Sequence, residues 1–122
     1  MSAMVVLSAR VEAWRAAWQS GDAARVARLY AADARHESAK VALAMPGLGR
    51  SHLRGRAEIE AYALRAFGRV HPLRFDIVSL SETETTSTVE YLRHAPDAAP
   101  MLVRETLMWR GAALADVRVE HL

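Results

Sequence analysis

Cysteine is absent from this chain of 122 residues. Its absence excludes disulfide bonds, thiolate-bound zinc and a cysteine nucleophile, and it fits a reducing compartment. The five histidines have neither the HxxxH nor the HxH spacing of a zinc site, so we expect no metal and no cofactor. The sequence also lacks the GxGxxG, GxxxxGK[ST] and GxSxG motifs, so nothing indicates a nucleotide site or a serine hydrolase.

Long hydrophobic runs are missing as well. A membrane-spanning helix needs roughly twenty apolar residues, and no segment approaches that length. The apolar run at the start covers only residues 4–7 and is not preceded by the basic region of a signal peptide. We therefore expect a cytoplasmic protein that does not associate with membranes.

Lysine is nearly absent, because 15 of the 16 basic residues are arginines and the exception is Lys40. The arginines are scattered among acidic residues, and the net charge is only +2. A nucleic-acid-binding protein would more often collect its basic residues in one patch or stripe. The charge pattern therefore does not indicate a nucleic-acid partner.

Helical spacing dominates the first half of what we expect to be one domain over residues 1–122. An apolar stripe predicts a first helix that ends at Ser20, and Gly21 and Asp22 suit its C-cap and the N-cap of the next helix. The second helix should end near Ala32, and a third should begin near Arg56. The first stripe consists of Leu7, Val11, Trp14 and Trp18.

Strand patterns fill the second half. Residues 34–42 best fit a short early strand, and residues 45–55, with one proline and three glycines, best fit a loop. From about His71 onward the hydrophobic period is two, which predicts a curved antiparallel sheet of about four strands. The fold class is therefore α+β, with the helices on one face of the sheet. The predicted later strands cover residues 72–80, 85–94, 101–110 and 114–122.

A carboxylate interrupts the apolar face of the strand at 101–110. Matching the apolar faces of the last two strands makes Glu105 and His121 diagonal neighbours, at roughly 7–8 Å along the backbone. This register requires a three-residue turn at 111–113. The predicted opposite pairs are Val103 with His121, Glu105 with Val119, Leu107 with Val117 and Trp109 with Ala115.

A buried carboxylate must find a partner or take up a proton, because burying the charge alone is costly. A Glu–His pair in an apolar pocket can act as a general acid and base near neutral pH. Glu105 and His121 are therefore candidate catalytic residues, and His36 on the early strand is a third. The alternation leaves open whether His36 or Glu37 points inward, and an arginine that pairs with Glu105 purely for structure is the alternative.

Two stretches, WRAAWQSGDAARVARLYAADARHES and LRGRAEIEAYALRAF, resemble a known family. Their order and spacing are similar to those of the SnoaL-like and ketosteroid-isomerase-like proteins of the nuclear-transport-factor-two-like superfamily. The resemblance implies a conical α+β barrel, in which a curved antiparallel sheet wraps three N-terminal helices around a deep, mostly apolar pocket. It also implies a homodimer formed through the outer face of the sheet, which would present Arg104, Thr106, Met108, Arg118 and Glu120.

Carried over residue by residue, the steroid isomerase site is incomplete. Its carbonyl-polarising tyrosine falls at Trp14, its aspartate base at Ser38, and its oxyanion-hole aspartate at Glu105. Ketosteroid isomerisation is therefore not expected, and the Asp–Arg–Asp set of limonene epoxide hydrolases cannot be reconstructed. The Asp and His of SnoaL-like cyclases have their nearest equivalent in Glu105 with His36 or His121.

These observations predict a pocket enzyme that transfers a proton on a small apolar substrate with a carbonyl or hydroxyl group. The reaction would be an isomerisation, cyclisation, dehydration or epoxide opening. The alternative is a non-catalytic module that binds a ligand or a protein on the same fold. The residues expected to bind the substrate are Trp14, Tyr30, Ser38, Tyr62, Trp109 and Val119.

Overall fold

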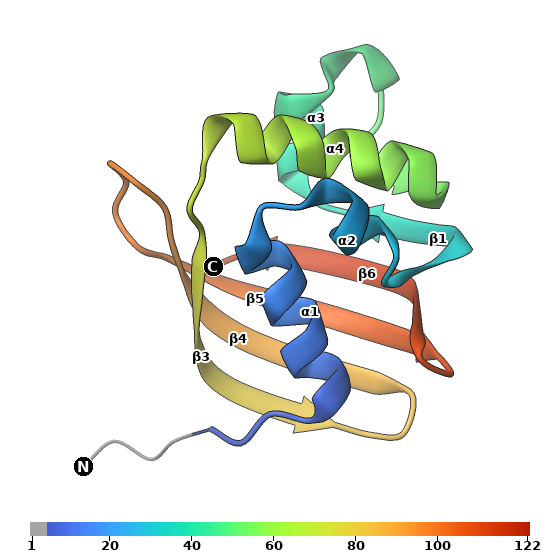
Figure 1. Cartoon of the computed structure of the whole chain (residues 1–122), viewed down its shortest axis with the longest axis vertical. Coiled ribbons are helices and arrows are strands. Elements are labelled where there is room, and N and C mark those ends of the chain that lie inside the picture. The colour runs from blue at the N-terminus through green and yellow to red at the C-terminus, as the bar shows by residue number, and fades with distance from the viewer. Residues whose placement is uncertain (1–4) are drawn as a thin grey trace.

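The computed structural model describes residues 5–122, so Met4 of the short apolar run at the start lies outside the described residues. Four α-helices and one 3-10 turn in this range pack on one face of a curved sheet (Figure 1). The helical elements are α1 (Ala9–Ser20), α2 (Ala23–Ala27), α3 (Ala39–Ala44), η1 (Pro46–Leu48) and α4 (Gly55–Arg69). The predicted α+β class is confirmed, with one more short helix than expected.

Within residues 5–122, the sheet has six strands in the order β2-β1-β6-β5-β4-β3. All neighbouring pairs are antiparallel except β1 and β6, which run parallel, so the sheet is mixed rather than purely antiparallel. The core lies between its concave face and the helices, where residues such as Val11, Ile59 and Leu107 are fully buried. The strands are β1 (Tyr30–Glu37), β2 (His52–Arg54), β3 (Arg74–Glu82), β4 (Thr86–His94), β5 (Met101–Arg110) and β6 (Ala113–His121).

The predicted caps between the first two helices are confirmed. Gly21 ends α1 with φ at 72°, in the left-handed region that favours glycine. The side chain of Asp22 accepts a hydrogen bond from the backbone N–H of Arg25 and so begins α2. These caps turn the chain back on itself within two residues, which lets both helices cover the same face of the sheet.

Three predicted segments between residues 22 and 55, a helix, a strand and a loop, differ from the structure. The second helix ends at Ala27 rather than near Ala32, and β1 begins at Tyr30 and ends at Glu37 rather than covering 34–42. The hydroxyl of Ser38 accepts a hydrogen bond from the N–H of Lys40 and starts α3. The segment 45–55, predicted as a loop, contains β2, whose pairing with β1 extends the sheet by one strand.

The β5–β6 register confirms three of the four predicted pairs, those of Val103, Glu105 and Leu107. The fourth is wrong, since Trp109 pairs with Leu114 across a bulge at Ala115. The turn accordingly has two residues, Gly111 and Ala112, rather than three. The extra residue on β6 lets Leu114 and Val117 both face the core.

Candidate active site

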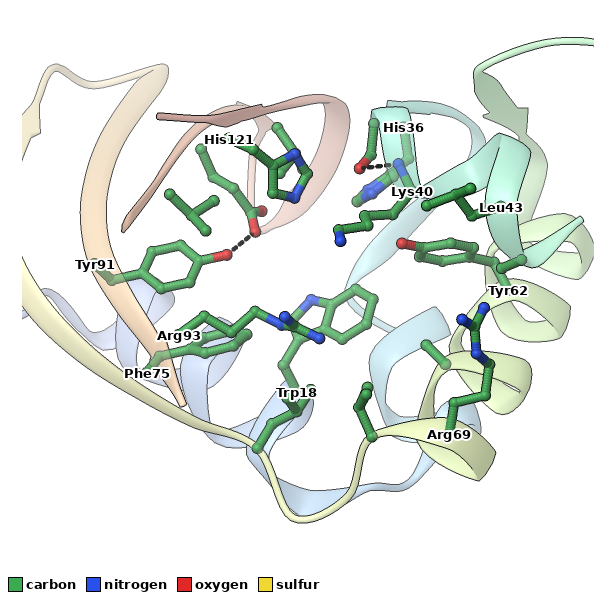
Figure 2. A pocket seen from close by; sticks show the side chains of 18 residues that line it. Trp18, His36, Lys40, Leu43, Tyr62, Arg69, Phe75, Tyr91, Arg93 and His121 are labelled. Atoms are coloured by element: carbon green, nitrogen blue, oxygen red, sulfur yellow. Dashed lines mark hydrogen bonds between the residues drawn. The ribbon is translucent and has the colours of Figure 1, made fainter. Parts of the chain in front are cut away.

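A cavity of about 160 Å³ opens between the concave face of the sheet and the helices α3 and α4 (Figure 2). Its size suits a small organic molecule, since an engineered apolar cavity of roughly 150 Å³ holds benzene. Most of the wall is apolar or aromatic, with side chains such as Phe75, Val103 and Leu73. A few polar groups converge on this space, and they define the candidate site.

Among the described residues, Glu105 is the only acidic one in the cavity wall, and only 5% of its surface is exposed. Its Oε1 accepts a hydrogen bond of 2.5 Å from the hydroxyl of Tyr91, while its Oε2 has no hydrogen-bond partner among residues 5–122. Burial raises the pKa of Glu105 to about 7, and the hydrogen bond from Tyr91 only partly opposes this shift. The carboxyl group can therefore gain or lose a proton near neutral pH.

The strand register brings Tyr91 to Glu105. In the β4–β5 ladder, Tyr91 lies opposite Val103 and Val89 lies opposite Glu105, so Tyr91 is the diagonal neighbour of Glu105 on the inner face. The ring of Tyr91 packs against Phe75, with centroids 4.4 Å apart. This packing fixes the direction of the hydroxyl toward the carboxyl group, as Figure 2 shows.

Trp14 lies behind Glu105 rather than in the cavity wall. It is fully buried, and its ring packs against Phe75 and Tyr91 with centroids 5.5 Å apart in each case. The indole N–H lowers the pKa of Glu105 as a nearby donor, although within residues 5–122 neither Nε1 nor the Oε2 of Glu105 forms a hydrogen bond of normal geometry. Trp14 thus supplies a weak donor and a rigid support, not a surface for the ligand.

His36 points inward, and Glu37 on the other face of β1 forms a 3.0 Å ion pair with Arg35. The Nδ1 of His36 is hydrogen-bonded to the hydroxyl of Tyr30 at 3.0 Å. Burial lowers the pKa of His36 to about 4, so the ring is neutral at physiological pH. When Tyr30 donates to Nδ1, the proton of the neutral ring is on Nε2, where it can be donated to a ligand.

Tyr62 and Ser38 complete the wall near His36. Burial raises the pKa of Tyr62 to about 12, so its hydroxyl keeps its proton and serves as a donor. Figure 2 shows this hydroxyl directed into the cavity. Ser38, where the resemblance places the aspartate base of steroid isomerases, is 2% exposed and caps α3.

His121 and Glu105 both line the cavity, and the register that makes them diagonal neighbours is confirmed. His121 is partly exposed, whereas His36 is buried. Burial, followed by the positive charges of Lys40 and Arg93, lowers its pKa. His121 is therefore a neutral donor or acceptor at neutral pH, and its position is closer to solvent than that of His36.

Six of the nine residues predicted for the site line the cavity and three do not. Tyr30 lies behind His36, and Trp14 lies behind Glu105. Trp109 belongs to another cluster, where its indole donates to Ser87 at 2.9 Å and Arg10 lies over its ring at 5.2 Å. The six that line it are His36, Ser38, Tyr62, Glu105, Val119 and His121.

The sequence interpretation missed several lining residues. Tyr91 could have been found, because β4 alternates and places Val89 and Tyr91 on its apolar face. No sequence pattern places Lys40, Arg69 and Arg93 at the cavity, since they belong to three separate elements and each looks in the sequence like an ordinary surface cation. Trp18 was recognised as part of an apolar stripe, but its place at the cavity was not predicted.

The described residues contain neither a metal-binding cluster nor a helix suited to a membrane. No three His, Asp or Glu side chains between residues 5 and 122 lie close enough together to hold a metal ion. None of the helices in the same range has the length and apolar character that crossing a membrane requires.

The family model of the SnoaL-like domain matches residues 11–118. The chain therefore belongs to the SnoaL-like family, as its sequence motifs indicated. A comparison with functionally curated proteins finds no match. The family assignment, rather than the function of any one relative, is what these comparisons establish.

Solved structures share the fold at low sequence identity. A protein of ketosteroid isomerase-like fold from Catenulispora acidiphila, in complex with trimethylamine, is 19% identical with a TM-score of 0.77, over 94% of this chain and 86% of that one. A candidate polyketide cyclase from Sinorhizobium meliloti is 12% identical with a TM-score of 0.76, over 93% and 95%. A candidate ketosteroid isomerase from Kribbella flavida is 16% identical with a TM-score of 0.68, over 93% and 76%.

Proposed function

We propose that this protein is a small-molecule enzyme in which Glu105 transfers a proton to and from a substrate held in the cavity. The observation that carries the proposal is a buried carboxyl group with one oxygen lacking a partner among residues 5–122 and a pKa of about 7, in a largely apolar wall. A carboxyl group with a pKa near the working pH is well matched to general acid–base catalysis.

The proposed reaction begins with the ionised form of Glu105. Its carboxylate removes a proton from a carbon next to the substrate carbonyl, and the electron pair of the broken C–H bond moves to the carbonyl oxygen. The neutral His36 and the hydroxyl of Tyr62 are the donors that stabilise the resulting enolate. Protonated Glu105 then returns the proton to another atom of the same substrate.

The atom that receives this proton decides the reaction class. Return to a different carbon gives an isomerisation, and donation to a departing hydroxyl group gives a dehydration. Donation to an epoxide oxygen, as the enolate carbon attacks the epoxide carbon and its C–O bond breaks, opens the epoxide and closes a new carbon ring. The names of two structural relatives, a candidate polyketide cyclase and a candidate ketosteroid isomerase, fall within this set.

A non-catalytic binding role is the second candidate, and the geometry at Ser38 favours it. The hydroxyl of Ser38 accepts a hydrogen bond from the N–H of Lys40 and so serves as a helix cap rather than as a base. In this case the cavity would bind a small molecule, and Glu105 would serve recognition through a hydrogen bond from its protonated form.

A ligand screen with wild type and Glu105→Gln tests whether the cavity is a site. Small ketones, lactones and epoxides should include compounds that raise the melting temperature of wild type. A ligand at a hundred times its dissociation constant adds about 2.7 kcal/mol to stability. The Gln variant should remain folded, because amide and carboxyl groups have similar shapes, and should bind the same compounds more weakly.

Glu60→Gln provides the matched control, because Glu60 is an exposed glutamate on α4 outside the cavity wall. It should bind every compound as wild type does. If no compound stabilises wild type, or if both variants lose binding equally, Glu105 is not the centre of a small-molecule site.

A further inference from the structure

Three positively charged side chains of the described residues line the cavity, and each comes from a different element. Lys40 is on α3, Arg69 is at the end of α4, and Arg93 is on β4. In Figure 2 the head groups of Lys40 and Arg93 extend toward the middle of the cavity, and the head group of the exposed Arg69 lies at its edge, below Tyr62. Elements far apart in the sequence therefore direct positive charge at one small volume.

The cavity provides these cations with no ionised partner from the described residues. Within residues 5–122, none of the three forms an ion pair, whereas Arg50 outside the cavity is paired with Glu58 at 2.7 Å. The only acid that these residues contribute to the wall is Glu105. The pKa of Glu105 is set by its burial, Tyr91 and Trp14 rather than by these cations.

The positive charges of Lys40, Arg69 and Arg93 act on titratable side chains in the cavity wall, which shows that the charges lie close to the cavity. Besides burial, the charges of Lys40 and Arg93 lower the pKa of His121, and those of Arg93 and Arg69 partly offset the rise that burial causes in the pKa of Tyr62. Both neighbours line the cavity. Burial distinguishes two parts of the cavity, because Glu105 is only 5% exposed, whereas Lys40 and Arg93 are partly exposed and Arg69 is exposed. The excess positive charge therefore lies on the solvent side of the Glu105 carboxyl group.

We infer that the substrate of this cavity is a small organic acid, with its carboxylate at the three cations and its carbonyl- or hydroxyl-bearing carbon skeleton directed at Glu105. Hydrogen bonds from ammonium and guanidinium groups to a carboxylate are stronger than neutral ones. The inference rests on the proposed function, since it names the substrate class of the same site. It also fixes an orientation, because the anionic group lies on the solvent side of Glu105.

Two matched pairs of probes test this inference by calorimetric binding measurements. One pair is levulinate and levulinamide, and the other is para-acetylbenzoate and para-acetylbenzamide. In each pair the carbon skeleton and the ketone are the same, and only the negative charge differs. The carboxylate should bind about 10- to 100-fold more tightly than the amide, and added salt should reduce the difference.

Variants of the cations show whether the cavity is responsible for the preference. Arg93→Gln should weaken carboxylate binding by about 10- to 100-fold and leave amide binding nearly unchanged. Lys40→Gln and Arg69→Gln should act in the same direction. Arg25→Gln is the control, because Arg25 is an exposed arginine on α2 outside the cavity wall.

Three results would overturn the inference: amides that bind as tightly as carboxylates, no binding of either carboxylate at millimolar concentration, or equal effects of Arg93→Gln and Arg25→Gln. Deuterium exchange next to the ketone of the same probes measures proton transfer separately. Exchange without a preference for carboxylates would refute the anionic substrate and leave the enzyme proposal intact. A preference for carboxylates without exchange would support the anionic substrate and refute proton transfer by Glu105.

Discussion

Replacing Glu105 with Gln should slow the exchange of hydrogen for deuterium next to the carbonyl of a bound ketone by roughly 10²- to 10⁴-fold, the usual contribution of a positioned acid or base. The amide of Gln keeps the shape of the side chain and can still accept a hydrogen bond from Tyr91, but it cannot take up a proton. Proton NMR in heavy water follows the exchange even when the product of the natural reaction is unknown.

The pH dependence of this exchange identifies the group that acts. Because the ionised form of Glu105 is the base, the wild-type rate should rise with pH and level off above about 7. His36, with a pKa of about 4, stays neutral over this range and should not add a second step. Glu60→Gln should retain the full rate, and an equal loss of rate in Glu60→Gln and Glu105→Gln would contradict a catalytic role for Glu105.

The second large effect is on stability. The free energy of unfolding of Glu105→Gln, relative to wild type, should rise by about 3 kcal/mol as the pH increases from about 4.5 to above 7. Between these values folded wild type keeps a proton on Glu105, whereas the unfolded chain has released it, because the pKa is about 7 when folded and 4.5 for an isolated glutamate side chain. The free energy of unfolding of wild type therefore falls as the pH rises, whereas that of the Gln variant has no such loss.

His36 produces the opposite dependence. Its pKa is about 4 when folded and 6.5 for an isolated histidine side chain, so the unfolded chain binds the extra proton and stability rises with pH between these values. The effects of the two groups oppose each other near pH 5–6 and should nearly cancel in wild type. Glu105→Gln removes one of them and should reveal the rise due to His36.

Urea unfolding at a series of pH values measures both dependences. Tyr91→Phe is the matched variant, because it keeps the carboxyl group and removes the hydrogen bond that lowers the pKa of Glu105. In this variant the pH range over which stability falls should extend upward. A constant difference between wild type and Glu105→Gln at all pH values would mean that folding does not change the pKa of Glu105, and would contradict a raised pKa in the folded protein.

The parts of the fold that could be predicted from the sequence depend on local or periodic signals. The caps at Gly21 and Asp22 follow from backbone conformation, and the pairing of Glu105 with Val119 follows from the need to bury both apolar faces. The bulge at Ala115 could not be predicted from the alternation of apolar and polar residues in β6. One extra residue changes which side chains face the core, but no residue in the sequence marks where it is inserted. The error at Trp109 follows directly from this bulge.

The candidate site was predictable only in part. Glu105 is conspicuous because a carboxylate on an apolar face needs an explanation, and the family resemblance indicates the same position. Alternation in β4 places Tyr91 on the inner face, but its contact with Glu105 depends on how β4 pairs with β5, and the loop 95–100 does not by itself fix that register. His36 is neutral because elements distant in the sequence bury it. Lys40 and Arg93 line one cavity only because the tertiary fold brings their elements together.

The central claim is that Glu105 exchanges a proton near neutral pH, and a carbon NMR titration of the protein with labelled glutamate side-chain carboxyls tests it most directly. Comparison with Glu105→Gln assigns the signal. We predict a titration of this signal with a pKa of about 7. A pKa at or below the value of 4.5 for an isolated glutamate would show an ionised carboxylate held by structure alone, and would contradict the proposed role of Glu105.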